Sequence, residues 1–290
     1  MRAPVLRRGG VAPFVLVSPA LAVFLMFYVV PMVNLFISSF YRFDPTSGII
    51  PAFTLANYLK FLGDSFYLGV LWRTLRISLV VTLAALSIGY PVAYYLVQVK
   101  GRARNYLTLL VLSPLLISMV IRTYGWVIIL SKQGVINSFL AFLGWGKELN
   151  LLYTEAGVEI GLTHIFLSFM VLAIMGALER IDPSVVRAAG NLGAGPVATF
   201  LKVILPLSLP GILAGSAIVF SLSSSAFVTP AILGGPQARV VSYITFEQDL
   251  VLLNWPFGAA VAFILLFITT ALLMGYSRVL EKGRFGVVFK

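Results

Sequence analysis

The chain has 290 residues, of which 60% are hydrophobic and 11% are charged, and its formal net charge is +11. A soluble domain of this size cannot bury so much apolar surface, so the composition excludes one and predicts a protein that uses the bilayer as its solvent. The chain has no cysteine, which excludes disulfides, thiolate metal sites and cysteine nucleophiles.

Six apolar runs, separated by polar segments, follow one another along the chain. Each is long enough to cross a bilayer as a helix. They lie near residues 12–40, 75–98, 106–131, 158–178, 207–228 and 256–278. The first run is too long for the apolar core of a signal peptide, so we expect it to be a span. The predicted fold is all-α, a polytopic membrane protein with six transmembrane helices.

Basic residues gather in alternate connections between these runs. The segments 1–11, 99–105, 179–206 and 278–290 hold 13 of the 21 Lys and Arg residues. The positive-inside rule therefore places these four segments, and both termini, in the cytoplasm. The net charge is then explained by membrane topology, and no basic face with interleaved aromatic residues indicates a nucleic-acid partner.

The opposite connections, 41–74, 132–157 and 229–255, are longer and are predicted to lie outside. The middle one contains the sequence VINSFLAFLGWG at 135–146, whose apolar residues recur at helical spacing. A short interfacial helix and a packed loop both explain this pattern.

Polar residues interrupt the third and fourth runs. Arg122 lies within the third run, where it either lines a translocation path or extends to the outer interface from the end of the span. Tyr124 and Trp126 follow it, as candidates for a cation path or for an interfacial aromatic belt. His164, in the fourth run, is the only histidine, and we expect a hydrogen-bonding role within the bundle and no metal site.

A predicted pair of short helices occupies 182–206, between the fourth and fifth spans. Asp182 followed by proline is typical of a capped helix start, and Gly193 is suited to the left-handed conformation that ends a helix. Pro196 starts the second helix, ATFLKVIL, which we expect to end before Pro206.

The junction between these two helices carries almost no side chain. The small residues are Ala188, Ala189, Gly190, Gly193, Ala194 and Gly195. Such a surface allows another protein to approach the backbone closely. The alternative is an amphipathic helix that rests on the membrane face.

The fifth run begins with Gly211 and Gly215, a G-x-x-x-G pair that permits close helix packing. The serine run 221–225, which includes Ser223 and Ser224, and the nearby Pro230 weaken the helix and offer hydroxyl groups. A gate or a solute contact and ordinary bundle packing both account for this composition.

Two acids, Glu247 and Asp249, lie in the last outer segment. They are candidates for attracting a cationic solute at the outer mouth, and the alternative is a solvated loop.

The stretch RAAGNLGAGPVATFLKVILP resembles the cytoplasmic EAA motif of ATP-binding-cassette (ABC) importer permeases. The residues that match in register are Ala188, Ala189, Gly193, Val203, Leu205 and Pro206. Arg187 stands where the motif has glutamate. If the glutamate of the motif makes a polar contact with the ATPase, the side chain at this position has the opposite charge here.

Further segments resemble one branch of that family, the permeases of the spermidine/putrescine type. They are GYPVAYYLV (89–97), RTYGWVIIL (122–130), GVINSFL (134–140), LLYTEAGVEIGLTHIFLSFMVLAIMGALERIDPS (151–184), LPGILAGSAIVFSLSSSAFVTPAILGG (209–235) and NWPFGAA (254–260). The resemblance implies a transmembrane domain over 12–280, an EAA-type loop at 179–206 and a C-terminal tail at 281–290.

The resemblance also implies partners and a location. In the family, the loop between the fourth and fifth spans docks as a coupling helix on a dimer of cytoplasmic ATPases, a second permease completes the path, and a periplasmic binding protein delivers the solute. ATP and Mg would belong to the ATPase, and this chain, which lacks a G-x-x-x-x-G-K-[S/T] loop, would bind no cofactor and catalyse no reaction. The implied location is the bacterial inner membrane.

The resemblance points to a polyamine such as spermidine or putrescine as the solute, and leaves open an opine or an amino-acid derivative. Two other classes of protein remain as alternatives. A self-sufficient secondary transporter would need intramembrane carboxylates for ion coupling, and a membrane enzyme would need an acid–base pair or a metal cluster.

Overall fold

The computed structural model describes residues 12–144 and 148–282, which form two compact units. Unit 1 joins the chain up to Gly63 with Thr245–Phe263, and unit 2 joins Asp64–Ile244 with the chain from Ile264 onward. The predicted N-terminal tail, 1–11, and residues 283–290 of the predicted C-terminal tail lie outside the described residues.

The first predicted span, in unit 1, is helical with a π-helical turn in its middle. Its parts are α1 (Ala12–Phe24), η1 (Leu25–Val29) and α2 (Val30–Ser38). The π-helical turn precedes Pro31, whose ring removes a backbone donor and crowds the preceding turn, and the wider turn accommodates that ring. The span Val17–Ser38 has a mean hydropathy of 2.3 and none of its most apolar stretch is buried within the protein, which suits a helix surrounded by lipid.

A hairpin and a short helix follow in unit 1, where the sequence predicts only an outer segment. The elements are β1 (Tyr41–Asp44), β2 (Gly48–Phe53) and α3 (Ala56–Gly63), and the two strands pair antiparallel. Asp44 closes the turn by accepting hydrogen bonds from the backbone N–H groups of Thr46 (2.9 Å) and Ser47 (3.0 Å). Gly48 then adopts a φ of +75°, a left-handed conformation that glycine adopts without strain.

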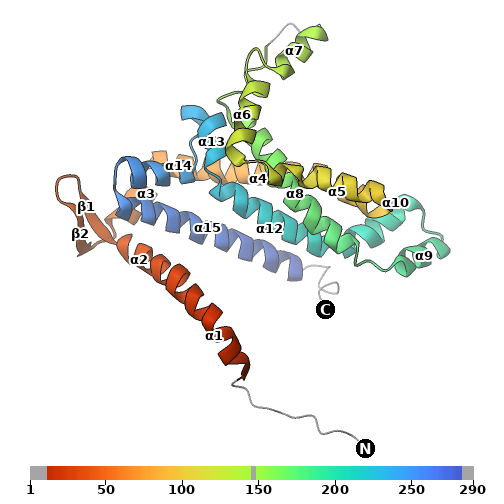
Figure 1. The fold of residues 1–290 in the computed structure, drawn as a ribbon, viewed down its shortest axis with the longest axis horizontal. Helices are drawn as coiled ribbons and strands as arrows, with labels where there is room; N and C mark the ends of the chain where they lie inside the picture. The colour runs from red at the N-terminus through yellow and green to blue at the C-terminus, as the bar shows by residue number, and fades with distance from the viewer. Residues whose placement is uncertain (1–11, 145–147, 283–290) are drawn as a thin grey trace, which may run out of the picture. The chain divides into compact units, whose positions relative to one another are not determined.

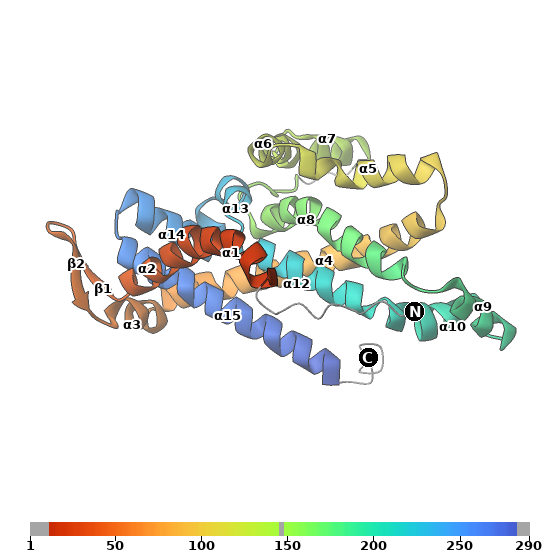
Figure 2. The ribbon, with the colours of Figure 1, turned by 60° about the horizontal axis from the view of Figure 1, so that its bottom comes forward.

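Three long helices form the core of unit 2. They are α4 (Ser65–Gln98), α8 (Glu155–Leu178) and α12 (Leu209–Ser225), and they lie side by side in both views (Figures 1 and 2). The apolar cluster that joins them includes Ile77, Val81, Met170, Ile174 and Val219. These helices correspond to the second, fourth and fifth predicted spans.

The helix α4 begins ten residues before the predicted span 75–98. Asp64 caps it by accepting a hydrogen bond from the backbone N–H of Phe66 at 2.8 Å. At about 1.5 Å per residue its 34 residues exceed the apolar thickness of a bilayer, about 30 Å. The polar residues near its start, among them Arg73, lower the hydropathy there without interrupting the helix.

The third predicted span, 106–131, is wrong as a single helix. The chain forms α5 (Arg102–Leu116) and α6 (Met119–Leu130), separated by extended backbone at Ile117 and Ser118. Pro114 lies in the last turn of α5, where its ring disfavours a continuous helix. The short helix α7 (Val135–Phe142) confirms the helical alternative for the start of 135–146, and residues 145–147 lie outside the described residues.

The remaining helices follow in order. In unit 2 they are α9 (Pro183–Asn191), α10 (Pro196–Thr199), η2 (Phe200–Ile204), α11 (Leu205–Leu207), α13 (Val228–Leu233) and η3 (Gly235–Ala238). The helix α14 (Val241–Phe246) leads from unit 2 into unit 1, where η4 (Glu247–Val251) follows, and α15 (Trp255–Lys282) starts in unit 1 and continues into unit 2.

In the described chain, the number of helices that are long and apolar enough to cross a membrane is five or six, against the six predicted spans. Five helical segments are long and apolar enough to cross, and a sixth arises if Pro196–Leu207 and Leu209–Ser225, bent by 59°, form one broken span. The segment that replaces the third prediction is Met119–Phe142, because the helix break shifts the apolar stretch toward α7.

Candidate functional site

The helices α9 and α10 stand together at one end of unit 2, beyond the ends of α8 and α12 (Figures 1 and 2). Asp182 accepts a hydrogen bond from the backbone N–H of Ser184 at 2.7 Å, and this bond to the charged form lowers the pKa of the Asp182 carboxyl. Gly193, at φ +82°, follows the helix end, as predicted. Local capping thus defines the start of α9, and the half-buried Val186 packs this helix against the apolar core.

The junction between α9 and α10 is open on its outer side. A methyl group added at Gly190, Gly193 or Gly195 would meet no other atom within 4 Å. Leu192, a large apolar side chain, is 88% exposed there. Arg187 and Ala188 are exposed as well, whereas Ala189 and Ala194 are half-buried. The surface therefore combines close access to the backbone with exposed apolar side chains, of which Leu192 is the most exposed.

The second helix of this element continues past Pro206, so the prediction that it ends before that residue is wrong. The π-helical turn η2 lies just before it, and α11 carries the chain to Leu207. The wider turn supplies the room that the proline ring needs, and the direction changes only at Ser208. Pro206 is half-buried and lies away from the open junction.

An aromatic contact ties this element to α4. The ring of Phe200, in η2, lies edge-on to those of Tyr90 and Tyr94, with centroid distances of 5.7 and 5.6 Å. The Tyr90 hydroxyl also forms a 2.9 Å hydrogen bond with the hydroxyl of Ser208, at the bend. A displacement of α10 would therefore reach the long core helix through packed groups.

Arg122 contacts the helix break. Its Nη1 donates to the carbonyl oxygen of Pro114, one of the last carbonyls of α5, which lack partners within their own helix. Its Nε is buried and has no hydrogen-bond partner. Arg122 is half-buried, and its roles in a translocation path or at the outer interface both stay predictions. Arg122 thus joins the end of α5 to the start of α6.

Trp126 and His164 form a pair beside it. The Trp126 indole N–H donates to His164 Nδ1 at 3.4 Å, and the two rings meet edge-on at 5.4 Å. The predicted hydrogen-bonding role of His164 is confirmed. Tyr124 is 57% exposed. Among residues 12–144 and 148–282, no cluster of three or more His, Cys, Asp or Glu side chains is suited to a metal.

Sequence reasoning missed an ion-pair cluster between α4 and α8. Arg73 Nε lies 3.0 Å from Glu155 Oε1, and Arg76 pairs with the other carboxylate oxygen. Arg73 also donates to the backbone carbonyl of Arg239 at 3.3 Å. These residues come from three distant segments of the chain, and no local sequence pattern predicts their pairing.

The hydroxyl groups of the candidate serines form hydrogen bonds within their own helix. Ser223 and Ser224 are buried, and their hydroxyls donate to the carbonyl oxygen of Phe220 at 3.4 and 2.8 Å. The hydroxyl groups offered by the sequence therefore serve the last turn of α12 in this structure.

The acidic candidates belong to unit 1. Asp249, in η4, packs against Gly258 so closely that a methyl group added at Gly258 would lie 1.8 Å from Asp249 Oδ1. That oxygen is buried without a hydrogen-bond partner, and burial raises the pKa of Asp249 from 3.8 to about 6. Glu247 lies in the same turn and is half-buried. Neither acid is simply part of a solvated loop.

No protein-family model matches the sequence. The chain is 34% identical over 261 residues to the spermidine/putrescine transport system permease protein PotB of Escherichia coli (strain K12), covering 89% of this chain and 94% of PotB. The chain belongs to the ABC transporter permeases of the spermidine/putrescine type. A second relative, the inner membrane ABC transporter permease protein YdcU of Escherichia coli (strain K12), is 32% identical over 265 residues, 87% of this chain and 84% of that protein.

Solved structures agree with the fold of this permease. A bacterial alginate ABC transporter in complex with an alginate pentasaccharide-bound periplasmic protein matches with a TM-score of 0.74 and 17% identity, over 93% of this chain and 94% of that chain. The inward-facing MetNI methionine ABC transporter matches with a TM-score of 0.58 and 20% identity, over 75% and 98% of the two chains. At these identities the likeness concerns the fold. Membership of this family, with five to six candidate spans in the described chain, makes the protein a multi-pass inner-membrane permease.

Proposed function

We propose that this chain is one of two permease subunits of an ATP-driven importer and that it lines the path of a small amine, with spermidine and putrescine as the first candidates. The observation that carries the proposal is the 34% identity over 94% of a permease named for those two solutes. The exposed element at residues 182–207 supports it independently, because a small-residue surface of this kind suits a partner that drives the transporter.

The junction of α9 and α10 is the proposed docking surface for a cytoplasmic ATPase dimer. Its open glycines admit a partner to the backbone, and the exposed Leu192 supplies an anchor. The residues proposed to contact the ATPase are Arg187, Ala188, Ala189, Gly193 and Ala194. Arg187 would face an acidic group of the partner. ATP and Mg would bind to the ATPase, and no cofactor to this chain.

Docking would be transmitted into the membrane through Phe200. The Phe200 ring contacts the rings of Tyr90 and Tyr94, and Tyr90 forms a hydrogen bond with Ser208. These contacts connect the proposed docking surface with the core helix α4. Packed aromatic groups have few alternative positions, so a shift of α10 would move α4. Docking of a cytoplasmic ATPase would require the α9 surface to lie on the cytoplasmic side, and the distribution of basic residues supports that side for this surface and for both termini.

A second permease, proposed to be a different chain, would complete the path, and a periplasmic binding protein would deliver the solute. The alginate ABC transporter of similar fold is described in complex with a periplasmic protein. Within the candidate spans of the described chain the acids are Glu155 and Glu159, both near the start of α8, and Glu155 is paired with arginines. So few carboxylates suit weak passage of a polycation, with selectivity assigned to the binding protein.

Two alternatives remain distinct in experiment. An opine or an amino-acid derivative would use the same machinery, and the relative YdcU has a name that states no solute. A self-sufficient secondary transporter would couple uptake to an ion through an intramembrane acid, for which Glu159 is the candidate, and would transport its solute without an ATPase.

The test is purification of the tagged chain from native membranes with identification of its partners, comparing wild type with Gly193→Trp. The variant should lose the ATPase but keep the second permease, because the bulky ring covers the proposed docking surface. Gly144→Trp is the matched control: Gly144 has nearly the same φ, +81°, and equally open surroundings, but lies after α7. It should retain all partners.

Uptake of labelled spermidine should be lost in Gly193→Trp and preserved in Gly144→Trp. Normal ATPase recovery and uptake in Gly193→Trp would refute the docking surface. Uptake by the chain without any ATPase would favour the secondary transporter. ATP-dependent uptake that unlabelled spermidine and putrescine do not compete would reject the polyamine and leave the importer.

A further inference from the structure

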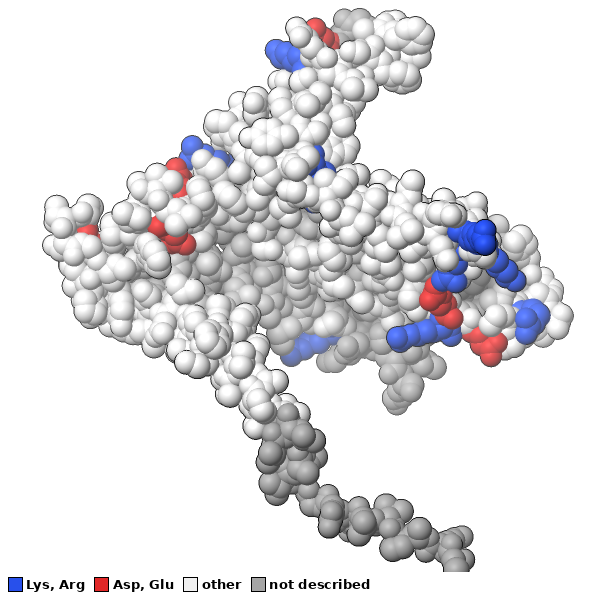
Figure 3. Space-filling model, in the orientation of Figure 1, with Lys and Arg blue, Asp and Glu red and all other residues white. Residues whose placement is uncertain are grey.

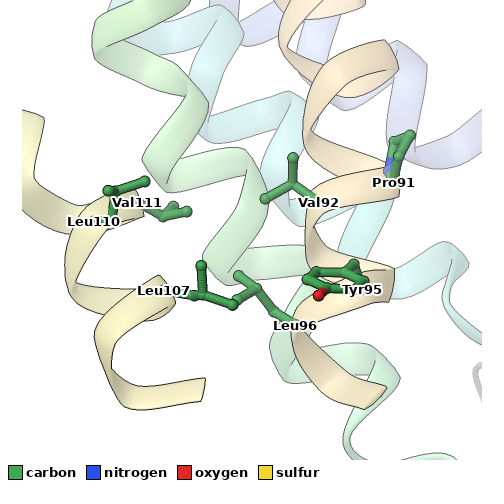
Figure 4. Close-up of a pocket in the computed structure, with 7 residues that line it drawn as sticks. All are labelled: Pro91, Val92, Tyr95, Leu96, Leu107, Leu110 and Val111. Atoms are coloured by element: carbon green, nitrogen blue, oxygen red, sulfur yellow. The ribbon is translucent and has the colours of Figure 1, made fainter. Parts of the chain in front are cut away.

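A groove lined by carbon lies between α4 and α5, on the side of α4 away from the proposed docking element's aromatic contact. Its volume is about 330 Å³. The lining side chains are Pro91, Val92 and Leu96 from α4 and Leu107, Leu110 and Val111 from α5, with the ring of Tyr95 at one end (Figure 4). Leu110 is 68% exposed and Tyr95 is 61% exposed. The groove is therefore open at the surface rather than enclosed.

The turn that joins α4 to α5 carries a concentration of positive charge. Lys100 and Arg102 are exposed, and Arg104 pairs with Glu179 at the end of α8. Lys and Arg side chains gather at this end of unit 2 (Figure 3). Because Arg104 already has a carboxylate partner, Lys100 and Arg102 supply the excess positive charge.

The start of α5 adds to this charge. Gly101, at φ +72°, provides no side-chain cap for the first N–H groups of the helix, and the first turn contains no acid. Basic residues at a helix N-terminus are unfavourable because they lie at the positive end of the helix dipole. An anion at this turn would accept hydrogen bonds from the free N–H groups and neutralise the charge of the basic side chains.

The groove and the charged turn are adjacent along the same two helices. Leu96 precedes the turn by four residues, and Leu107 follows it by a few. From Arg102 to Val111 the helix rises about 13 Å, close to the apolar thickness of one leaflet, about 15 Å. A molecule with an anionic head at Lys100 and Arg102 would thus reach along the whole groove with an apolar tail of leaflet depth.

We propose that this site binds an anionic phospholipid, with its phosphate at Lys100, Arg102 and the start of α5 and one acyl chain in the groove between α4 and α5. A phospholipid meets both requirements at once: the carbon lining excludes a polar ligand, and the charged turn selects an anionic head group over a zwitterionic one. The proposal is independent of the transported solute and of the ATPase.

The test uses photo-cross-linking from a single cysteine, because the chain has none of its own. The intact importer carrying Leu110→Cys, labelled with a benzophenone maleimide, is reconstituted in nanodiscs of phosphatidylcholine with a minor fraction of phosphatidylglycerol. After illumination, mass spectrometry of the peptide containing position 110 gives the ratio of the two lipid adducts. Leu83→Cys serves as the control site, because Leu83 is exposed like Leu110 but lies on α4 outside the groove.

At position 110 phosphatidylglycerol adducts should exceed the bulk lipid ratio at least about five-fold, since one basic side chain near a membrane contributes about 1 kcal/mol to anionic lipid binding. The double change Lys100→Gln with Arg102→Gln should return the ratio to that of the bulk, whereas Lys132→Gln, an exposed lysine elsewhere, should leave it unchanged. The ratio at position 83 should equal that of the bulk.

Three results would overturn the proposal. They are a bulk ratio at position 110 in the wild-type background, an enrichment that persists when both basic residues are replaced, and adducts with the second permease in place of lipid, which would make the groove a contact between subunits.

Discussion

The packing of α12 on α8 depends on a glycine that leaves no room for a side chain. A methyl group built at Gly211 would lie 2.5 Å from Ala177 Cβ, 2.7 Å from the Ala173 carbonyl oxygen and 3.1 Å from Ile174 Cα. Two of these three atoms belong to the backbone of α8, so no rotamer change relieves the contact. Gly211→Ala must push the two helices apart.

The magnitude follows from opposing effects. Overpacking a well-packed core costs about 1–3 kcal/mol, and backbone obstruction places Gly211→Ala at the upper end. Replacing glycine by alanine within a helix returns up to about 1 kcal/mol. We therefore expect Gly211→Ala to lower the free energy of unfolding by about 2 kcal/mol.

Two further glycines complete a graded series. At Gly215 the nearest atom is Met170 Sδ, at 2.8 Å, and a flexible thioether can move, so Gly215→Ala should cost about 1 kcal/mol or less. At Gly176, on α8, an added methyl group meets nothing within 4 Å. Gly176→Ala should therefore be neutral or stabilising by up to about 1 kcal/mol.

Thermal unfolding of the purified protein in one detergent, followed by intrinsic tryptophan fluorescence, measures the series. At about 2–4 °C per kcal/mol, Gly211→Ala should lower Tm by roughly 4–8 °C, Gly215→Ala by less, and Gly176→Ala not at all. A Tm for Gly211→Ala equal to or above that of wild type, or a larger loss for Gly176→Ala than for Gly211→Ala, would refute the reasoning about helix contact.

Two other predictions concern single side chains. Arg122→Met leaves the Pro114 carbonyl without its donor and should cost about 1–3 kcal/mol of stability, measured as a lower Tm; loss of uptake at unchanged Tm would instead assign Arg122 to the path. The folded-state pKa of Asp249, about 6, is above its unfolded value of 3.8, so the folded protein binds the extra proton and loses stability as pH rises from about 4 to about 6. The stability of Asp249→Asn should therefore match that of wild type near pH 4 and exceed it above pH 6 by about 1 kcal/mol, after discounting for partial exposure. A series of Tm values against pH measures this difference. An equal gain in stability at both ends of the series, or the same profile for Glu148→Gln, would contradict this assignment.

Signals carried by neighbouring residues were sufficient for much of the fold. Long apolar runs indicate spans because a bilayer requires about 20 apolar residues in succession. Asp182 and Gly193 define the ends of α9 because capping and left-handed termination involve only backbone groups a few residues away. The family followed in the same way, from motif residues read in register.

The interruption of the third span depended on tertiary structure. Pro114 alone does not require a break, since Pro91 lies inside the continuous helix α4. Arg122 becomes half-buried and bonds to the exposed carbonyl only when α5 ends early. The prediction at Pro206 failed for a related reason, because a π-helical turn accommodated the ring instead of ending the helix.

The sequence by itself thus determined the bilayer environment, most of the apolar spans and the capped element between the fourth and fifth, all of which depend on composition or on contiguous residues. Only the tertiary structure decided which charged groups pair and which surfaces remain open. Glu155 meets Arg73 from 82 residues away, and the groove between α4 and α5 is lined by side chains from both helices. Such contacts depend on how helices pack against one another, and hydropathy, which treats each helix separately, carries no information about that packing.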